Sequence, residues 1–266
     1  MTPALHITAD DYGLHADINS AVVRLLASEA LTDTSAMGNG RAIESGAELL
    51  RTLGRSFVGL HLCWVGCERA LGPMPVLAPH GQLPERAQLS RRAIRHPRAA
   101  RSELFAEGMR QARALQSFGL RITHVDSHQH MHVLPGAHLV VLEIARRLGG
   151  LPVRLPRVVN PLSRPIGLLL DTFSQQLERA AARMGIPTYQ SFGFEDSGRQ
   201  NRESLRSYLM HSMPPGSELM THPGDSTPGL RRDYGRWRYD WSGEAASLEE
   251  VRSWRESRKV TTASFD

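Results

Sequence analysis

Short apolar segments typical of buried strands alternate with amphipathic helical segments along nearly the whole chain of 266 residues. Such alternation indicates a mainly parallel sheet, because a helix must carry the chain back between successive parallel strands. We predict strands at 4–9, 34–38, 57–62, 121–126, 152–156, 186–191, 217–222 and 259–265, and helices at 16–30, 42–53, 101–119, 136–150, 166–184, 201–211 and 247–257. We therefore expect one α/β domain over residues 1–266, an irregular (β/α) barrel of the TIM type rather than an open doubly wound sheet.

One connection is far longer than the others. Residues 63–98 follow the third predicted strand and are rich in Gly, Pro and Arg. A segment of this length is too long for a plain strand-to-helix connection in a compact domain. We predict that this insert is a lid or substrate loop.

The composition excludes several classes of protein. The longest apolar runs, such as residues 166–170, are too short to cross a bilayer, so no transmembrane segment is expected. The first residues show neither a basic region nor an apolar stretch of the secretory kind, and we expect a cytoplasmic location. Cys63 and Cys67 are too few for a disulfide framework, and there is no second cysteine pair to complete a zinc site, so both are predicted to be reduced.

The chain is basic, with a formal net charge of +5 and a sequence pI of about 9.7. Lys259 is the only lysine, and the arginines are scattered without interleaved aromatic residues, so nucleic acid is not predicted as a partner. The densest basic run, RRAIRHPRAAR at 91–101, is interpreted as a solvated face. The alternative is a patch that attracts an acidic surface or an anionic lipid.

Polar residues gather where four of the predicted strands end. Asp10 and Asp11 follow the first strand, His61 ends the third, THVDSHQHMH (123–132) ends the next, and His222 ends the strand near 220. Parallel α/β proteins carry their chemistry at the carboxyl ends of strands. One histidine at a strand end is usually structural, but four polar strand ends together predict a site on one face of the barrel.

The donor types within this site suit a cation. Adjacent side chains at the end of an extended strand point in different directions, so we expect one aspartate to bind an ion while the other stands beside it. The alternative is a tight turn in which the aspartates cap the next helix. In the cluster at 123–132, only one or two histidines can reach an ion shared with Asp11 and His61. Two imidazoles and a carboxylate leave positions open for water and substrate, and these donors suit zinc.

Five motifs in the chain resemble those of the YdjC-like carbohydrate deacetylases, in the same order and spacing. This family includes chitooligosaccharide deacetylases and hopanoid-biosynthesis deacetylases. The motifs are TADDYG (8–13), GLHL (59–62), THVDSHQHMH (123–132), VRLPR (153–157) and LMTHPG (219–224), and the similarity covers nearly the whole chain.

The resemblance implies an irregular (β/α) barrel, one divalent metal ion, commonly magnesium, and the hydrolysis of an N-acetyl group from an amino sugar or an acetylated oligosaccharide or glycolipid. It places the metal on Asp11, His61 and His128, and makes Asp10 the general base and His222 the general acid. It also implies that Arg154 and Arg157 line the site and hold a carboxylate or a substrate oxygen, and that the protein forms a homodimer. The roles of His124, His130 and His132 stay open.

The chain departs from the family pattern in two places, with Trp64 after GLHL and SAMGNG (35–40) after the second strand. We expect both segments to border the sugar pocket and to affect the choice of substrate. Two other functions remain possible on the residues alone. One is a metal-dependent phosphoesterase on a similar barrel, which often needs two metals about 3.5–4 Å apart. The other is a non-catalytic protein that binds sugar or sequesters metal.

Overall fold

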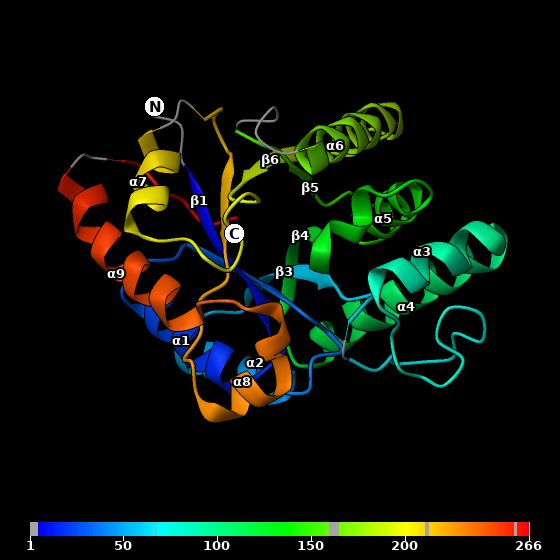
Figure 1. Ribbon diagram of the computed structural model, residues 1–266, viewed down its shortest axis with the longest axis horizontal. Helices are drawn as coiled ribbons and strands as arrows, with labels where there is room; N and C mark the ends of the chain where they lie inside the picture. The colour runs from blue at the N-terminus through cyan, green and yellow to red at the C-terminus, as the bar shows by residue number, and fades with distance from the viewer. Residues whose placement is uncertain (1–4, 67, 160–164, 211–212, 258–259, 266) are drawn as a thin grey trace.

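Seven parallel strands form a closed barrel and follow one another around it in chain order (Figure 1). The computed structural model describes residues 5–66, 68–159, 165–210, 213–257 and 260–265. The strands are β1 (His6–Tyr12), β2 (Asp33–Ala36), β3 (Phe57–Leu62), β4 (Arg121–Ser127), β5 (Val153–Pro156), β6 (Thr188–Phe192) and β7 (Glu218–Thr221). Because β1 pairs with both β2 and β7, the barrel closes, which confirms the predicted architecture.

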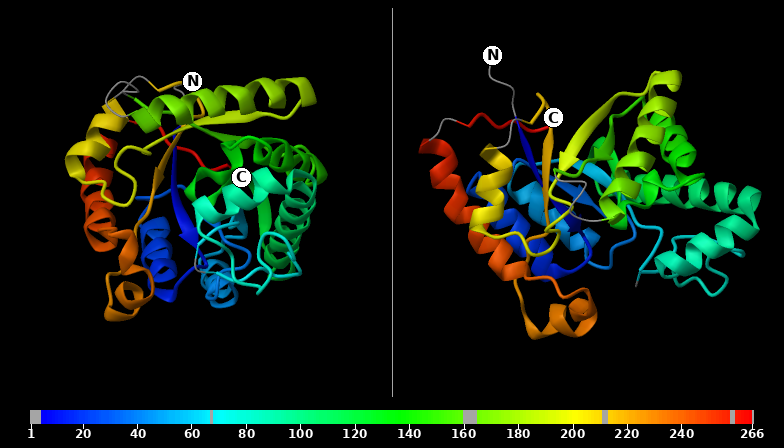
Figure 2. Two further views of the ribbon diagram at one scale, coloured as in Figure 1. Left: turned by 45° about the vertical axis from the view of Figure 1, so that its right-hand side comes forward. Right: turned by 45° about the horizontal axis from the view of Figure 1, so that its top comes forward.

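Helices connect the strands and cover the outside of the barrel (Figures 1 and 2). They are α1 (Ala16–Ala27), α2 (Ile43–Thr52), α3 (Arg86–Arg95), α4 (Pro97–Ser117), α5 (Ala137–Arg147), α6 (Pro165–Met184), α7 (Arg202–Met210), α8 (Pro228–Tyr234) and α9 (Trp241–Ser257), with short 3₁₀ segments η1 (His128–Val133) and η3 (Gly235–Trp237). Their apolar faces point inward; in α1 the buried face includes Ile18, Val22 and Leu25, at the spacing expected of an amphipathic helix.

The predicted eighth strand at 259–265 does not form. Among the described residues of this segment, only Thr262 makes a bridge, to Leu5. Both edges of β1 are already paired, so a further strand has no place in the ladder despite its β-branched residues. Instead the Phe265 ring stacks on His6, with 3.7 Å between the ring centroids, and lies 4.2 Å from the ring of His124. The end of the chain therefore packs across the opening of the barrel where β1 begins.

The insert after β3 is held against α4 rather than hanging free. Glu103 of α4 accepts hydrogen bonds from the backbone N–H groups of Val76 and Leu77, and Glu107 accepts one from Leu71. Helix α3 lies within the insert and packs beside α4 (Figure 2). Because these carboxylates satisfy loop amides that lack partners in a strand or helix, they fix the shape of an otherwise irregular segment.

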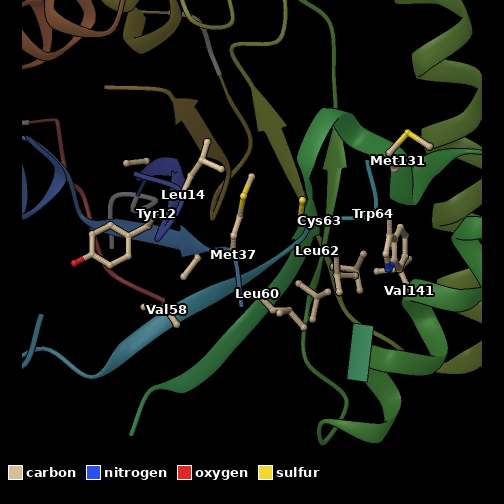
Figure 3. Packing of buried hydrophobic residues seen from close by; sticks show 14 of the residues in the cluster. Tyr12, Leu14, Met37, Val58, Leu60, Leu62, Cys63, Trp64, Met131 and Val141 are labelled. Carbon is tan, nitrogen blue, oxygen red and sulfur yellow. The ribbon is translucent and has the colours of Figure 1, made fainter. Parts of the chain in front are cut away.

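The hydrophobic core fills the space between the strands and their helices. Figure 3 shows Leu60 and Leu62 of β3 in this core, with Trp64 near Met131 and Val141. Trp64 is fully buried and is not among the described residues that line the candidate pocket, so the structure does not place it where it was expected. Its large ring fills the core directly after β3 instead. The described part of the chain contains no helix long and apolar enough to cross a membrane.

The SAMGNG segment is also a packing feature. A Cβ atom on Gly38 would lie 2.2 Å from the backbone oxygen of Gln111 in α4, and one on Gly40 would lie 2.3 Å from the backbone oxygen of Gly13. Neither neighbour is the end of a flexible side chain that could move aside. These glycines therefore allow close approach of backbone to backbone, and neither is among the described residues that line the pocket.

We predict that Gly38→Ala lowers the free energy of unfolding by about 1–3 kcal/mol, because the added methyl group overpacks the contact with α4. Urea denaturation followed by circular dichroism measures the change. Gly229→Ala is the matched control, since its Cβ would meet nothing closer than 3.5 Å. Equal stability of the two variants would contradict the packing assigned to Gly38.

Candidate active site

The two aspartates of β1 lie side by side at the carboxyl end of the barrel, where the strand is irregular. Asp11 has a φ of 63°, and the pairing of β1 with β2 shifts register between Ala9 and Tyr12. In a regular strand, neighbouring side chains point to opposite faces. The irregularity turns Asp11 so that both buried carboxylates lie at the carboxyl end of the barrel. Aspartate tolerates this left-handed conformation better than most residues do.

Three of the predicted ligands converge on one point. Asp11 Oδ1 lies 3.0 Å from His128 Nδ1 and 3.3 Å from His61 Nε2, and the candidate donor atoms of the three residues lie within 4.8 Å of one another. Asp11 Oδ2 is buried and has no hydrogen-bond partner in the described chain. One carboxylate and two imidazoles on three different elements form a donor set suited to a divalent cation.

The charge around this point favours a cation as well. Four carboxylates are buried here, those of Asp10, Asp11, Asp126 and Glu218. The buried guanidinium of Arg154 lies between three of them and makes ion pairs with Asp10, Asp126 and Glu218. Burial lowers the pKa of His61, but the carboxylates of Asp10 and Asp126 outweigh it and raise the pKa to about 10. Buried negative charge is costly without compensation. A divalent cation would supply that compensation and displace the proton from His61.

Asp126 orients one of the candidate ligands. Its Oδ1 lies 2.6 Å from His61 Nδ1, which leaves Nε2 of the same ring turned toward Asp11. A carboxylate behind a metal-binding histidine fixes the tautomer and the ring direction. Sequence reasoning did not assign this role to Asp126. The sequence did carry one indication: Asp126 alternates with the histidines of the segment 123–132, so in an extended strand it shares a face with them.

The second aspartate of the pair has different neighbours. Asp10 accepts two hydrogen bonds from Arg154, at 2.7 and 2.8 Å, and its Oδ2 lies 4.0 Å from His222 Nε2. Burial lowers the pKa of His222 and outweighs the opposite effect of the Asp11 and Asp10 carboxylates, so the imidazole is neutral near pH 7. Glu244 of α9 accepts a hydrogen bond from the backbone N–H of His222 and fixes this strand end.

A pocket of about 540 Å³ opens above these groups. Aromatic rings form much of its wall: the ring of Trp237 lies 5.0 Å from that of His128, and the ring of Tyr239 lies 5.2 Å from that of His222. The insert reaches it through residues at the start of α3. The lining residues are Asp10, His61, Glu85, Arg86, Ala87, Ser127, His128, Gln129, His130, Phe194, Ser197, His222, Trp237 and Tyr239.

The two predicted substrate arginines are both engaged by carboxylates of the protein. Arg154 is buried inside the barrel with Asp10, whereas Arg157 pairs with Asp171 and Glu178 of α6. Neither is among the described residues that line the pocket. Substrate binding by these arginines stays a prediction, and the structure gives Arg154 a clear role in holding Asp10.

The remaining histidines of the cluster have separate surroundings. His124 points into the barrel toward Phe265 and Tyr189, and His132 is buried between Ser127 and the backbone oxygen of Arg154. His130 lines the pocket, with its ring 5.4 Å from that of Phe194. Only His130 is therefore placed where it can meet a substrate.

The model of the family described as "YdjC-like protein" matches residues 4–256. The chain belongs to the YdjC-like family. Among curated YdjC-like relatives, a carbohydrate deacetylase of Geobacillus stearothermophilus is 31% identical over 65% of this chain and 72% of the relative. A chitooligosaccharide deacetylase of Enterobacter sp. (strain 638) is 28% identical over 89% of this chain and 88% of the relative.

Solved structures support the fold of this YdjC-like chain. A protein of Enterococcus faecalis described as a cellobiose-phosphate cleavage protein superposes with a TM-score of 0.78 at 19% identity, over 100% of this chain and 98% of the other. A CE4 esterase of Streptococcus mutans superposes with a TM-score of 0.51 at 12% identity, over 99% of this chain and 86% of the other. At these identities, the likeness concerns the barrel alone.

We predict that Asp126→Asn weakens binding of a divalent cation by about 10–100-fold, because His61 loses the partner that fixes its ring. Isothermal titration of the metal-free protein with Zn²⁺ measures the affinity. Asp33→Asn is the matched control: Asp33 is also buried beside a histidine, His6, but away from the three ligands. Equal affinities of Asp126→Asn and the control would show that Asp126 has no part in the site.

A second prediction concerns pH. Burial lowers the pKa of His124 and of His132 to about 4, from an ordinary value of 6.5. Between these values the two histidines bind more protons in the unfolded chain than in the folded one, so their contribution makes the free energy of unfolding rise with pH from about 4 to 6.5. In metal-free His132→Gln, the slope should fall by up to about 1.4 kcal/mol per pH unit. An unchanged slope in urea denaturation would rule out a buried neutral His132.

Proposed function

We propose that this YdjC-like protein is a metal-dependent hydrolase that removes the N-acetyl group from an amino sugar and releases acetate. The observation that carries the proposal is the arrangement of Asp10 and His222 beside the Asp11, His61 and His128 group. The names of the curated relatives, which are carbohydrate and chitooligosaccharide deacetylases, support the same reaction. The aromatic rings of Trp237 and Tyr239 offer apolar surfaces on which the C–H faces of a sugar can pack.

Asp11, His61 and His128 are the residues proposed to hold the cation. A divalent cation in such a site lowers the pKa of water and polarises a carbonyl oxygen. Two imidazoles and one carboxylate suit zinc better than magnesium, which prefers oxygen ligands. We therefore propose zinc for this chain, although the family resemblance favours magnesium.

The protein's own groups provide the proton transfers. In the proposed reaction, Asp10 accepts a proton from the water that attacks the acetyl carbonyl, and Arg154 holds the carboxylate in place for this step. His222 is neutral at rest and cannot donate a proton until it has received one. With Nε2 of His222 4.0 Å from Asp10, we propose that the proton passes through His222 to the leaving amine.

The insert at 63–98 is proposed to be the substrate loop, because Glu85, Arg86 and Ala87 line the pocket. The phosphoesterase alternative commonly uses two cations. Two further groups of buried donors exist, Asp10–His61–Asp126 and His124–Asp126–Glu218. Arg154 makes ion pairs with carboxylates of both groups, so its positive charge opposes a second cation there.

We predict that Asp10→Asn retains the metal but lowers deacetylation at least about 100-fold, because an amide cannot accept the proton from water. Asp11→Ala and His128→Ala should lose both metal and activity. Metal content is measured by elemental analysis, and turnover by acetate release. If Asp10→Asn retained full acetate release, the role proposed for Asp10 would be wrong.

The function itself is tested by acetate release from a panel of N-acetylated sugars, with metal-stripped protein and with protein reconstituted with Zn²⁺ or Mg²⁺. We expect release only from reconstituted protein. Hydrolysis of simple phosphate esters without acetate release would favour the phosphoesterase. Sugar binding without turnover by the metal-replete protein would favour a non-catalytic binder.

A further inference from the structure

Helix α3 in the insert carries an unusual concentration of positive charge. Its ten residues include Arg86, Arg91, Arg92 and Arg95, and they contain no acidic residue. Arg86, Arg91 and Arg95 are exposed, and Arg92 is partly so. Like charges gathered on one short helix repel one another and favour a negatively charged partner.

Arginines of α3 line two hollows that lie beside the active-site pocket. The first, of about 420 Å³, includes His80, Glu85, Gln88 and Arg92 and shares Glu85 with the active-site pocket. The second, of about 570 Å³, is lined by Pro75, Val76, Gln88, Arg91, Arg92, Arg95 and His96 and shares Gln88 and Arg92 with the first. We call the two hollows together the basic groove. Because neighbouring hollows share lining residues, the groove borders the pocket at Glu85 and follows α3 away from it.

Few protein carboxylates balance the charge of the groove. Glu85 is the acidic residue among its described lining residues, and it pairs with Arg236 at 2.9 Å. Arg92 Nη1 donates to the backbone oxygen of Leu77 at 2.6 Å, which fixes its guanidinium at the wall. In the described part of the chain, no carboxylate lies within ion-pair distance of Arg91, Arg92 or Arg95. These guanidiniums are therefore available to an anion from outside.

We propose that the basic groove binds the chain of an anionic glycan, one that carries carboxylate groups, while an N-acetylated sugar of the same chain enters the pocket. This inference rests on the proposed function and names its substrate class. Arginine binds carboxylates through paired N–H groups, which matches such a chain. An acidic membrane would also be attracted by arginines, but it does not require a groove that borders the active-site pocket.

The test compares two N-acetylated oligosaccharides of equal length: a neutral one, and one in which uronic acid residues alternate with the N-acetyl sugar. Reconstituted wild-type protein should deacetylate the anionic chain with the higher kcat/KM, and the difference should shrink as salt is raised. Arg91→Gln/Arg95→Gln should lower kcat/KM for the anionic chain about 3–10-fold, mainly through KM. It should leave the neutral chain unchanged.

Arg98→Gln/Arg101→Gln is the matched control. It removes the same charge from neighbouring positions on α4, which line a different, largely apolar hollow. The control should behave as the wild type on both chains. Equal loss in the two double variants would overturn the proposal, because a general charge effect would then explain the result. Equal kcat/KM for the neutral and anionic chains in the wild type would overturn it as well.

A binding measurement separates this inference from the proposed function. An oligouronate without acetyl groups is titrated into metal-replete protein, and its affinity should fall about 3–10-fold in Arg91→Gln/Arg95→Gln but not in the control. Such binding, together with no acetate release from any N-acetylated oligosaccharide, would uphold the groove and refute the deacetylase. Binding to phosphatidylglycerol vesicles that depends on Arg91 and Arg95, with no binding of the oligouronate, would overturn the groove in favour of a membrane.

Discussion

The site depends on one buried guanidinium. Arg154 on β5 lies inside the barrel and makes ion pairs with Asp10 on β1, Asp126 on β4 and Glu218 on β7, each at 2.7 Å. A buried ion pair contributes little to stability by itself, but the loss of one partner leaves uncompensated charge and costs several kcal/mol. Arg154 therefore constrains the positions of carboxylates on three strands at once.

The arrangement of the proposed site follows from this constraint. Asp10 is held by Arg154 and Asp126 holds His61, while Asp11 turns aside in a left-handed conformation to meet His128. Left-handed φ values recur at Gln129 and His130, directly after His128. Backbone strain of this kind costs of order 1–3 kcal/mol per residue and persists only where the surroundings enforce it. These left-handed residues stand on both sides of the proposed metal site, as expected if the fold holds the ligands in position before a cation binds.

The sequence predicted correctly those features that depend on one strand at a time, namely the position of each strand and the polar residues at its end. Hydrophobic periodicity located the seven strands. The rule for strand ends brought Asp11, His61 and the segment 123–132 to one site, and the family resemblance singled out His128 within that segment. The sequence prediction failed where the result depended on which strands pair in the folded barrel. The segment ending at Phe265 looks like a strand, but both edges of β1 were taken. Local sequence also cannot reveal that Asp126 lies behind His61 or that Arg157 pairs with α6, because these partners lie far apart in the chain.

The structure divides chemistry from recognition. Of the residues proposed for the reaction, Asp10, Asp11 and His61 lie on barrel strands, and His128 and His222 directly follow β4 and β7. The Arg154 ion pairs fix Asp10, Asp126 and Glu218 on these strands. Among the described residues of the insert, Glu85, Arg86 and Ala87 line the pocket, and Glu103 and Glu107 of α4 anchor the insert from behind. Those anchors come from α4, and among the described residues Arg92 is the groove arginine that donates a hydrogen bond to the preceding loop, so Arg91 and Arg95 on the outward face of α3 take no such part in holding the insert. That face can therefore carry a charge pattern suited to one substrate without disturbing the reaction centre.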